Sequence, residues 1–231
     1  LGIERHTWVF PRAFTESNFM SVVSSRKDLG ASPGFRIAGQ VALQLAGVSF
    51  NQIRLCELYS CFPYAVRVQL QEFGLDWLHN VSVTGGMTFG GGPLNNFVLQ
   101  ATARMARLLR QNPGETGLVT AVSGFLTKQA CALWSCTPGA EGWGCADVTE
   151  QVRALSEVCD VVANYSGKAS VAGYTVLYQG LVPSRAVAVF DLPDGRRTVA
   201  YSENAQLMEL MMAQECCGAT YQVADGKFQS C

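Results

Sequence analysis

The stretch Glu57-Leu58-Tyr59-Ser60-Cys61-Phe62-Pro63 indicates the fold more clearly than any other part of this 231-residue chain. It overlaps a largely apolar run, residues 53–59, which predicts a buried strand. Pro63 suits the first position of a helix, which the sequence predicts as far as Gly74. Polar and nucleophilic side chains therefore gather where a strand ends and a helix begins. Open α/β sheets bind their ligands at such an edge.

The sequence around this stretch continues the alternation of strands and helices. Ser32-Pro33 predicts the start of a helix and Gly47 its end. A long amphipathic helix is expected within 93–112. Three further segments are predicted as strands: 81–83, 117–123 and 126–135. This order favours an α/β layer, a mixed sheet with helices on its faces, over a sandwich of two sheets.

The composition changes after residue 136. Residues 137–163 are expected to form a linker and a short helix, and residues 164–231 are β-rich. Asp194-Gly195 between alternating runs predicts a hairpin. We interpret 164–231 as a small antiparallel β-barrel-like module that is too small to be very stable alone. The predicted domains are therefore 1–136, 137–163 and 164–231.

The charge and hydropathy of the chain exclude two classes of partner. Its 17 basic and 18 acidic side chains give a net charge of −1, which leaves no basic stripe for nucleic acid. No apolar run exceeds five residues, whereas a membrane-spanning helix needs roughly 20. We therefore expect neither a nucleic-acid partner nor a membrane span.

The nine cysteines and two histidines do not match a common metal or redox site. A four-cysteine site from Cys131, Cys136, Cys145 and Cys159 is the less favoured reading, because its spacings are irregular. The favoured reading is buried, reduced thiols in an intracellular, cytoplasmic protein. We expect no metal and no cofactor.

Five of the eight residues from Gly85 to Gly92 are glycine, and Pro93 follows at once. This is not a phosphate-binding loop, because no lysine follows, and the context does not match a dinucleotide fingerprint. So many glycines indicate that the backbone comes close either to a ligand or to another strand. Position favours the ligand, because the helix N-terminus that follows attracts an anion or a carbonyl oxygen.

Two interpretations of the Cys61 thiol are possible, one functional and one structural. A thiol near a helix N-terminus has a lowered pKa, which suits acid–base or nucleophilic work. The alternative is a buried Cys61 beside a structural tyrosine, Tyr59. The residues alone favour the structural reading.

Three blocks resemble, in order and spacing, the C-terminal half of a thiolase: 57–63, 83–96 and 117–124. The resemblance covers about residues 1–136, and it is greatest to sterol-carrier-protein-type thiolases and to thiolase-like proteins of type 1. The β-rich tail resembles the additional C-terminal domain of the type 1 proteins, including 173–176 and 194–197. It implies an acetyl-CoA acetyltransferase-like fold and activity on CoA thioesters in lipid metabolism, with the thioester as substrate and no separate cofactor.

The family's motifs are only partly kept. Its His-Asp-Cys-Phe block corresponds to 59–62, so the cysteine and phenylalanine remain while the histidine and aspartate do not. Its Gly-His-Pro block corresponds to 91–93 and lacks the histidine that activates the nucleophile. Its late Cys-x-Gly block corresponds to 122–124 and lacks the catalytic acid.

The resemblance implies the following roles at the matching positions. Cys61 would transfer protons, and the phenol of Tyr59 would act as a hydrogen-bond or proton donor. Ser60 is the third catalytic candidate. Backbone N–H groups around 91–93 or 123–124 would serve as oxyanion donors. The candidate substrate-binding residues are Gly91, Gly92, Asn95, Ser123 and Gly124.

Three functions stay open. The leading one is the C-terminal portion of an acyl-CoA acyltransferase with the usual base and acid replaced. The alternatives are a related lyase that cleaves β-hydroxyacyl-CoA by a retro-aldol step through Tyr59, and a non-catalytic acyl-CoA-binding protein.

Apolar and polar residues alternate soon after Leu1, in the stretch His6-Thr7-Trp8-Val9-Phe10. This suggests that the given sequence begins inside a folded domain. We therefore expect an N-terminal thiolase half in a full-length parent, with the nucleophilic cysteine, and a homodimer of that parent. The chain alone is expected to be inactive and poorly soluble. The peroxisome and the mitochondrion stay open as locations of the parent.

Overall fold

The computed structural model describes residues 2–76, 80–140 and 142–230, which form two compact units. The first unit is Leu1–Met20 with Gly30–Ser156, and the second is Ser21–Leu29 with Glu157–Cys231. The second unit thus takes in residues that the sequence analysis placed in the first domain and in the linker. Each unit has its own hydrophobic core.

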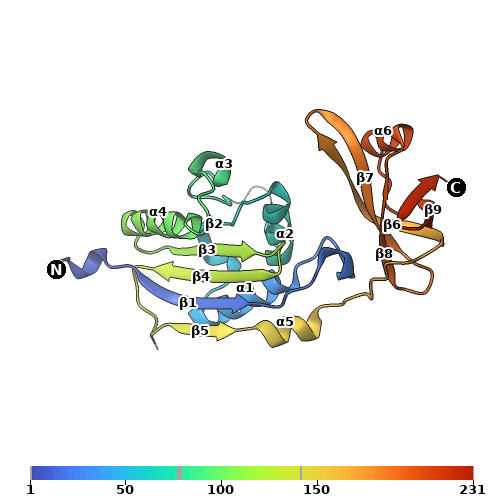
Figure 1. Ribbon diagram of the computed structural model, residues 1–231. Helices are drawn as coiled ribbons and strands as arrows, with labels where there is room; N and C mark the ends of the chain where they lie inside the picture. The colour runs from blue at the N-terminus through green and yellow to red at the C-terminus, as the bar shows by residue number, and fades with distance from the viewer. Residues whose placement is uncertain (1, 77–79, 141, 231) are drawn as a thin grey trace. The chain divides into compact units, whose positions relative to one another are not determined.

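The first unit is built on one five-stranded sheet, with strands in the order β2-β3-β4-β1-β5 (Figure 1). β2 is parallel to β3 and β1 is parallel to β5, whereas β4 is antiparallel to both of its neighbours. This confirms the predicted mixed α/β sheet. The strands are β1 Phe10–Ser17, β2 Ile53–Glu57, β3 Thr116–Ser123, β4 Lys128–Ser135 and β5 Gly144–Asp147.

Helices cover both faces of this sheet. Successive residues of a strand point to opposite faces, and β3 shows the consequence. Leu118 joins the core that α1 covers, and Val119 joins the smaller core that α4 covers. The α-helices of this unit are α1 Pro33–Ala46, α2 Pro63–Phe73, α3 Met87–Gly90, α4 Phe97–Gln111 and α5 Thr149–Leu155, and the short 3-10 helices are Arg5–Thr7 and Phe50–Gln52.

The ends of α1 and α2 are those that the sequence predicts. Both helices begin with proline, and both end at a glycine in the left-handed conformation, Gly47 at φ 67° and Gly74 at φ 65°. A side chain on Cβ disfavours this conformation, so glycine is the usual residue at such an end.

Two segments differ from the prediction. The expected strand 81–83 forms only an isolated bridge between Glu57 and Ser82. Within 137–163, expected to be a linker and a short helix, β5 joins the sheet beside β1 and precedes α5. Cys145 and Asp147 of β5 are exposed, so this short edge strand has no apolar alternation that would reveal it.

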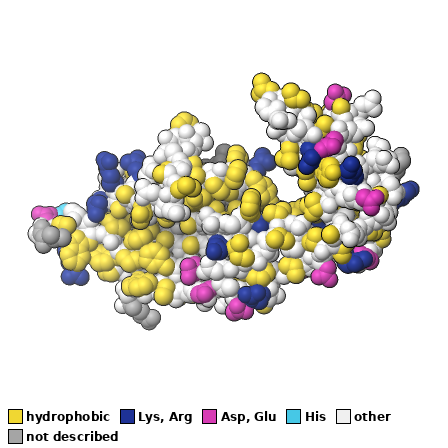
Figure 2. All heavy atoms as spheres, in the orientation of Figure 1, with side chains coloured by type: hydrophobic (Ala, Val, Ile, Leu, Met, Phe, Trp, Pro, Cys, Tyr) yellow, Lys and Arg dark blue, Asp and Glu magenta, His cyan; other side chains and the backbone are white. Residues whose placement is uncertain are grey.

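Part of the sheet face on the α4 side carries an aromatic cluster. Phe14 of β1 packs edge-on against Trp134, with ring centroids 5.3 Å apart, and against Trp143, at 5.8 Å. Trp143 is 57% exposed. Figure 2 shows hydrophobic side chains gathered over the part of the first unit where Figure 1 draws β3, β4 and β1.

The second unit is a closed five-stranded barrel with strand order β10-β8-β7-β6-β9, which confirms the predicted barrel-like module. All neighbouring strands are antiparallel except β8 and β10, which close the barrel in parallel. Phe190, Tyr221 and Phe228 pack edge-on inside it. Its elements are β6 Gly167–Gln179, β7 Val182–Asp191, β8 Arg197–Ser202, α6 Ala205–Ala213, β9 Thr220–Ala224, β10 Lys227–Ser230 and the 3-10 helix Val23–Ser25.

Residues 21–29, which we call the strap, belong to this second unit although they lie between β1 and α1 in the sequence. Arg197 holds the strap to the barrel. Its guanidinium donates hydrogen bonds to the carbonyl oxygens of Arg26 and, at 2.9 Å, Lys27, and it pairs with Asp191 at 2.7 Å. The Arg197 side chain is only 3% exposed, so the strap is an integral part of this unit.

Two further observations concern the described residues alone. None of their helices combines the length and the apolar character that crossing a bilayer requires. Every described cysteine has a free thiol.

Candidate functional site

The candidate site lies at one edge of the sheet in the first unit. Tyr59, Ser60 and Cys61 follow the end of β2, and β2 runs parallel to β3 with Glu57 opposite Val119. The carboxyl ends of β2 and β3 therefore lie at the same edge, and Ser123 is the last residue of β3. This is the edge at which α/β sheets bind ligands.

Tyr59 is fixed by three other elements. Its N–H donates to the Thr120 hydroxyl at 2.8 Å, and its carbonyl oxygen accepts from the Gln69 amide at 2.9 Å. The Thr120 hydroxyl in turn donates to the Gln69 side-chain oxygen at 2.5 Å. The Tyr59 ring packs edge-on against Phe97 of α4, with centroids 5.7 Å apart. Its hydroxyl forms no hydrogen bond with any described residue, so it is available to a ligand.

Glu57 ties the glycine-rich loop to the end of β2. Its fully buried carboxylate accepts hydrogen bonds from the Ser82 hydroxyl at 2.9 Å, the Thr84 hydroxyl at 3.0 Å and the Thr84 N–H at 2.9 Å. The Thr84 hydroxyl also accepts from the N–H of Gly86 at 3.1 Å. A buried carboxylate requires such partners, because an unpaired charge inside a protein is strongly unfavourable.

Ser60 tethers the same loop from the other side. Its hydroxyl oxygen accepts the N–H of Met87 at 2.9 Å. A Cβ on Gly86 would lie 2.9 Å from this oxygen, and Gly86 has φ 76°. At Gly86, therefore, the close approach that the glycines indicate is made to the chain's own turn after β2. Of the two explanations given for the glycines, a ligand or a neighbouring part of the chain, the second therefore applies at Gly86.

The glycine-rich loop leaves one of its predicted oxyanion donors free. The N–H of Gly91 donates to the carbonyl oxygen of Met87 at 3.1 Å and is not available. The N–H of Gly92 has no partner among the described residues, and Gly92 is exposed, as is Asn95. Asn95 adopts the left-handed conformation at φ 57° in the turn before α4.

The pKa of Cys61 is opposite in direction to the expectation from the sequence. Desolvation by its surroundings raises the pKa, and the backbone N–H groups of Phe62 and Cys61 lower it by less. Desolvation and the neighbouring Cys61 also raise the pKa of Tyr59. At neutral pH the thiol and the phenol are therefore both protonated, and both can donate a proton.

The turn at Ser123 and Gly124 lies at the same sheet edge, but the hydrogen bond described for it lies within the turn itself. Gly124, Phe125 and Leu126 all have positive φ, between 56° and 65°. The Thr127 hydroxyl donates to the Gly124 carbonyl oxygen within the turn. Among the described residues, Ser123 and Gly124 form no hydrogen bond with Tyr59, Ser60, Cys61 or the glycine-rich loop.

The sequence analysis missed four positioning residues: Glu57, Gln69, Thr84 and Thr120. Glu57 stands in the quoted stretch, and an acidic residue at the end of an apolar strand is a signal that a buried carboxylate must find partners. Ser82 and Thr84 provide those partners, but the sequence analysis assigned Ser82 only to the expected strand 81–83 and Thr84 only to the thiolase-like block 83–96.

The four cysteines considered for a metal site are divided between the units, with Cys159 in the second. Over the described ranges, no three His, Cys, Asp or Glu side chains are grouped so that they could hold a metal ion.

Comparison with known proteins finds similarity both to a family model and to solved structures. Residues 147–227 match the family model of the thiolase-like protein type 1 additional C-terminal domain. The whole chain matches a crystal structure described as a monomeric SCP2-thiolase like protein type 1 from Mycobacterium smegmatis, with a TM-score of 0.90 and 28% sequence identity.

The match covers 100% of this chain and 52% of that protein, so the chain spans about half the length of this relative. No curated protein matches the chain. The resemblance drawn from the sequence is thereby confirmed: the chain has the thiolase-like fold and carries the additional C-terminal domain of thiolase-like proteins of type 1.

Proposed function

We propose that the protein acts on CoA thioesters as a thiolase-like acyltransferase in lipid metabolism, with the usual histidine base and late cysteine acid replaced. The observation that carries the proposal is the turn after β2. It presents the Tyr59 phenol and the Cys61 thiol beside a loop whose Gly92 N–H is free. An acyl-transfer site needs a proton-transfer group and an oxyanion donor in close proximity.

The chain's own residues divide the proposed work as follows. In the cleavage direction, the Cα–Cβ bond of a 3-ketoacyl-CoA would break as its acyl part passes to the nucleophilic cysteine, and Cys61, protonated at neutral pH, would give its proton to the α-carbon. The CoA thiol that then takes up the acyl group would return a proton to Cys61. The N–H of Gly92 would stabilise negative charge on the thioester oxygen. Ser60 and Glu57 would act by positioning the loop. The nucleophilic cysteine would come from an N-terminal thiolase half of a parent protein.

The test is a survey of acyl-CoA esters, from acetyl-CoA to steroid-sized thioesters. Binding is measured by calorimetry, and products are followed by mass spectrometry. The proposal predicts binding of at least one ester, and turnover that Cys61→Ala reduces while Cys145→Ala, which removes another exposed thiol, does not. Neither binding nor turnover of any ester by the full-length protein would refute it.

Carbon–carbon lysis of a β-hydroxyacyl-CoA is the second candidate. The Tyr59 hydroxyl favours it, because that group has no partner among the described residues and adjoins Cys61. Tyr59→Phe should then abolish lysis and leave ester binding unchanged. Full lyase activity in this variant would exclude Tyr59. Binding without any product on prolonged incubation would instead indicate a non-catalytic acyl-CoA-binding protein.

Two expectations about the cellular context go with this proposal. A cytoplasmic location suits the free thiols of the described cysteines. A homodimer of the parent is the family expectation, whereas the matched relative is described as monomeric. Size-exclusion chromatography with light scattering on the full-length protein distinguishes the two states.

A further inference from the structure

The turn between β3 and β4 carries backbone strain. Gly124, Phe125 and Leu126 all adopt the left-handed conformation, with φ of 59°, 56° and 65°. Glycine does so freely, but the Cβ of a phenylalanine or a leucine is crowded there, so two bulky residues in succession are unusual. Residues in such conformations persist only where the surrounding structure enforces them, and they are frequent at ligand-binding sites.

Hydrogen bonds enforce the conformation of this turn. The Thr127 N–H donates to the Ser123 carbonyl oxygen at 3.2 Å, and the Gln129 amide donates to the Leu126 carbonyl oxygen. Gln129 is only 4% exposed, and its amide also donates to the Ser32 hydroxyl at 3.0 Å, just before α1. The turn is therefore fixed to the start of α1, and its strain is a lasting part of the fold.

The strained turn displays an aromatic ring to solvent. Phe125 is 81% exposed, and Met20, which lies against the turn, is 57% exposed. The Met20 sulfur lies 3.1 Å from the Thr127 hydroxyl oxygen and would lie 3.1 Å from a Cβ at Gly124. An apolar side chain that is exposed in this way adds little to the core. Strain and exposure together indicate that the ring is kept for contact with a ligand.

This turn lies at the sheet edge that carries the candidate site. β2 and β3 are neighbouring parallel strands, and their carboxyl ends lead into the turns 59–61 and 124–127. The Tyr59 N–H donates to the Thr120 hydroxyl, so the chain after β2 still follows β3 here. Phe62, directly after the first of these turns, is 66% exposed. The edge thus places apolar side chains beside the groups proposed to act on the thioester.

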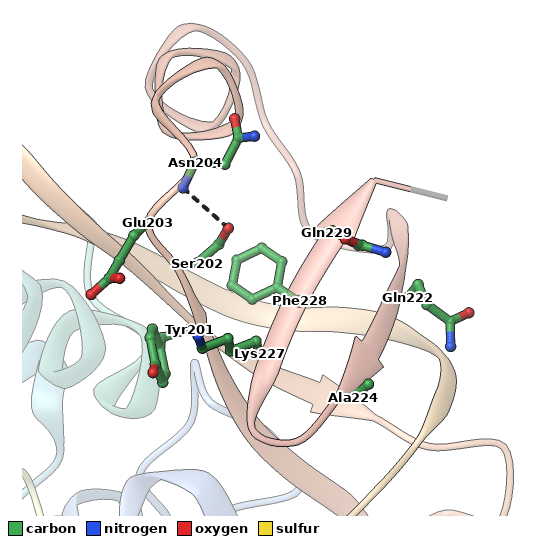
Figure 3. A pocket seen from close by; sticks show the side chains of 9 residues that line it. All are labelled: Tyr201, Ser202, Glu203, Asn204, Gln222, Ala224, Lys227, Phe228 and Gln229. Carbon is green, nitrogen blue, oxygen red and sulfur yellow. Dashed lines mark hydrogen bonds between the residues drawn. The ribbon is translucent and has the colours of Figure 1, made fainter.

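A hollow of about 320 Å³ in the second unit is less suited to an apolar ligand. Polar side chains make up most of its lining. Figure 3 shows that they do not converge, because Lys227 lies toward Tyr201, whereas Gln222 and Gln229 lie on the other side of Phe228. The turn between β3 and β4 is therefore the better candidate for an apolar contact.

We propose that Phe125 contacts the acyl chain of the thioester and selects long apolar chains over acetyl. The inference rests on the proposed function: the turn 59–61 would act on the thioester group, and the ring would cover the chain beyond it. Removing part of an exposed ring and of a hydrocarbon chain from water is favourable. Met20, whose flexible thioether adapts to irregular surfaces, would extend the contact.

The test compares acetyl-CoA with octanoyl-CoA, which differ only in the length of the acyl chain, on the full-length protein. Calorimetry measures the Kd of each ester. Phe125→Gly should weaken octanoyl-CoA binding about tenfold and leave acetyl-CoA binding unchanged. Phe125→Leu keeps an apolar side chain and should retain most of the affinity. Leu181→Ala, which truncates a side chain 95% exposed in the second unit, is the matched control and should bind both esters as the unmodified protein does.

A stability measurement separates this role from a structural one. Phe125→Gly should be at least as stable as the unmodified protein, because glycine adopts the left-handed conformation without strain. A lower thermal midpoint would show that the ring supports the fold and would overturn the inference. Equal weakening of both esters, or none, would overturn it and leave the proposed function intact. If the unmodified protein binds no acyl-CoA of any length, the proposed function fails and this inference fails with it.

Discussion

Replacing Arg197 by methionine should loosen the strap and destabilise the barrel. Methionine keeps most of the apolar stem but removes a guanidinium that is 3% exposed and that bonds two strap carbonyls and Asp191. Asp191 is 49% exposed, so its ion pair is partly screened and adds little. The two carbonyl oxygens lose charge-assisted bonds, and we expect a total loss of about 3 kcal/mol.

Two probes can separate the units in this experiment. The described tryptophans, Trp8, Trp134 and Trp143, belong to the first unit, whereas five of the seven tyrosines lie in the second. Hydrogen exchange of peptides from 21–29 and 167–202 should accelerate in Arg197→Met, and the barrel's urea midpoint should fall by roughly 1–3 M. Tryptophan fluorescence should report an unchanged transition of the first unit.

The neighbouring arginine provides the matched control. Arg196 is 48% exposed and pairs at 2.7 Å with Asp194, which is 50% exposed, so solvent screens this pair and Arg196→Met should leave the urea midpoint of the barrel almost unchanged. If Arg197→Met costs no more than this control, or if the strap stays as protected as before, Arg197 does not hold the strap and the reasoning fails.

Three further predictions concern the candidate site. Glu57→Gln should lower the stability of the first unit by about 2 kcal/mol, because an amide cannot accept all the donors of Ser82 and Thr84; an unchanged thermal midpoint would contradict this. Gly86→Ala should cost about 1–2 kcal/mol and speed hydrogen exchange in 85–92, because φ 76° and the contact with Ser60 both oppose a Cβ. Iodoacetamide should alkylate Cys61 more slowly at pH 7 in the folded chain than in an unstructured peptide of residues 57–65, because a raised pKa leaves less thiolate; mass spectrometry of the Cys61 peptide measures both the rate and its rise with pH, and a faster reaction in the folded chain would contradict the raised pKa.

Local signals made much of the fold predictable. Proline starts and glycine ends set α1 and α2, and the Asp194-Gly195 turn marked the hairpin of β7 and β8. Features that depend on distant partners were not predictable. The strap is bound through its backbone carbonyls, which leave no pattern in its side chains, and the parallel closure of the barrel rests on a single bridge.

In the candidate site, too, local features could be predicted from the sequence and features that depend on distant residues could not. The sequence identified the turn at 59–61 and the glycine-rich loop, and the structure brings them together through Ser60 and Met87. The direction of the Cys61 pKa was wrong, because proximity to a helix start is visible in a sequence whereas the desolvation that outweighs it is not. The role of Glu57 depends on Ser82 and Thr84, which lie some 25 residues further along the chain.

The strap also constrains the order of events during synthesis. Arg197 bonds a carbonyl oxygen 170 residues earlier in the chain. The strap's backbone also pairs with Glu157 and Cys159, which are made before Arg197. At a ribosomal rate of roughly 5–20 residues per second, the strap still waits on the order of ten seconds for these first partners, and longer for Arg197. Through that interval its backbone groups are free to pair with other chains. The nascent protein is therefore exposed to mispairing for longest at a segment close to its beginning, and a chaperone that shields 21–29 would act before any part of the barrel exists.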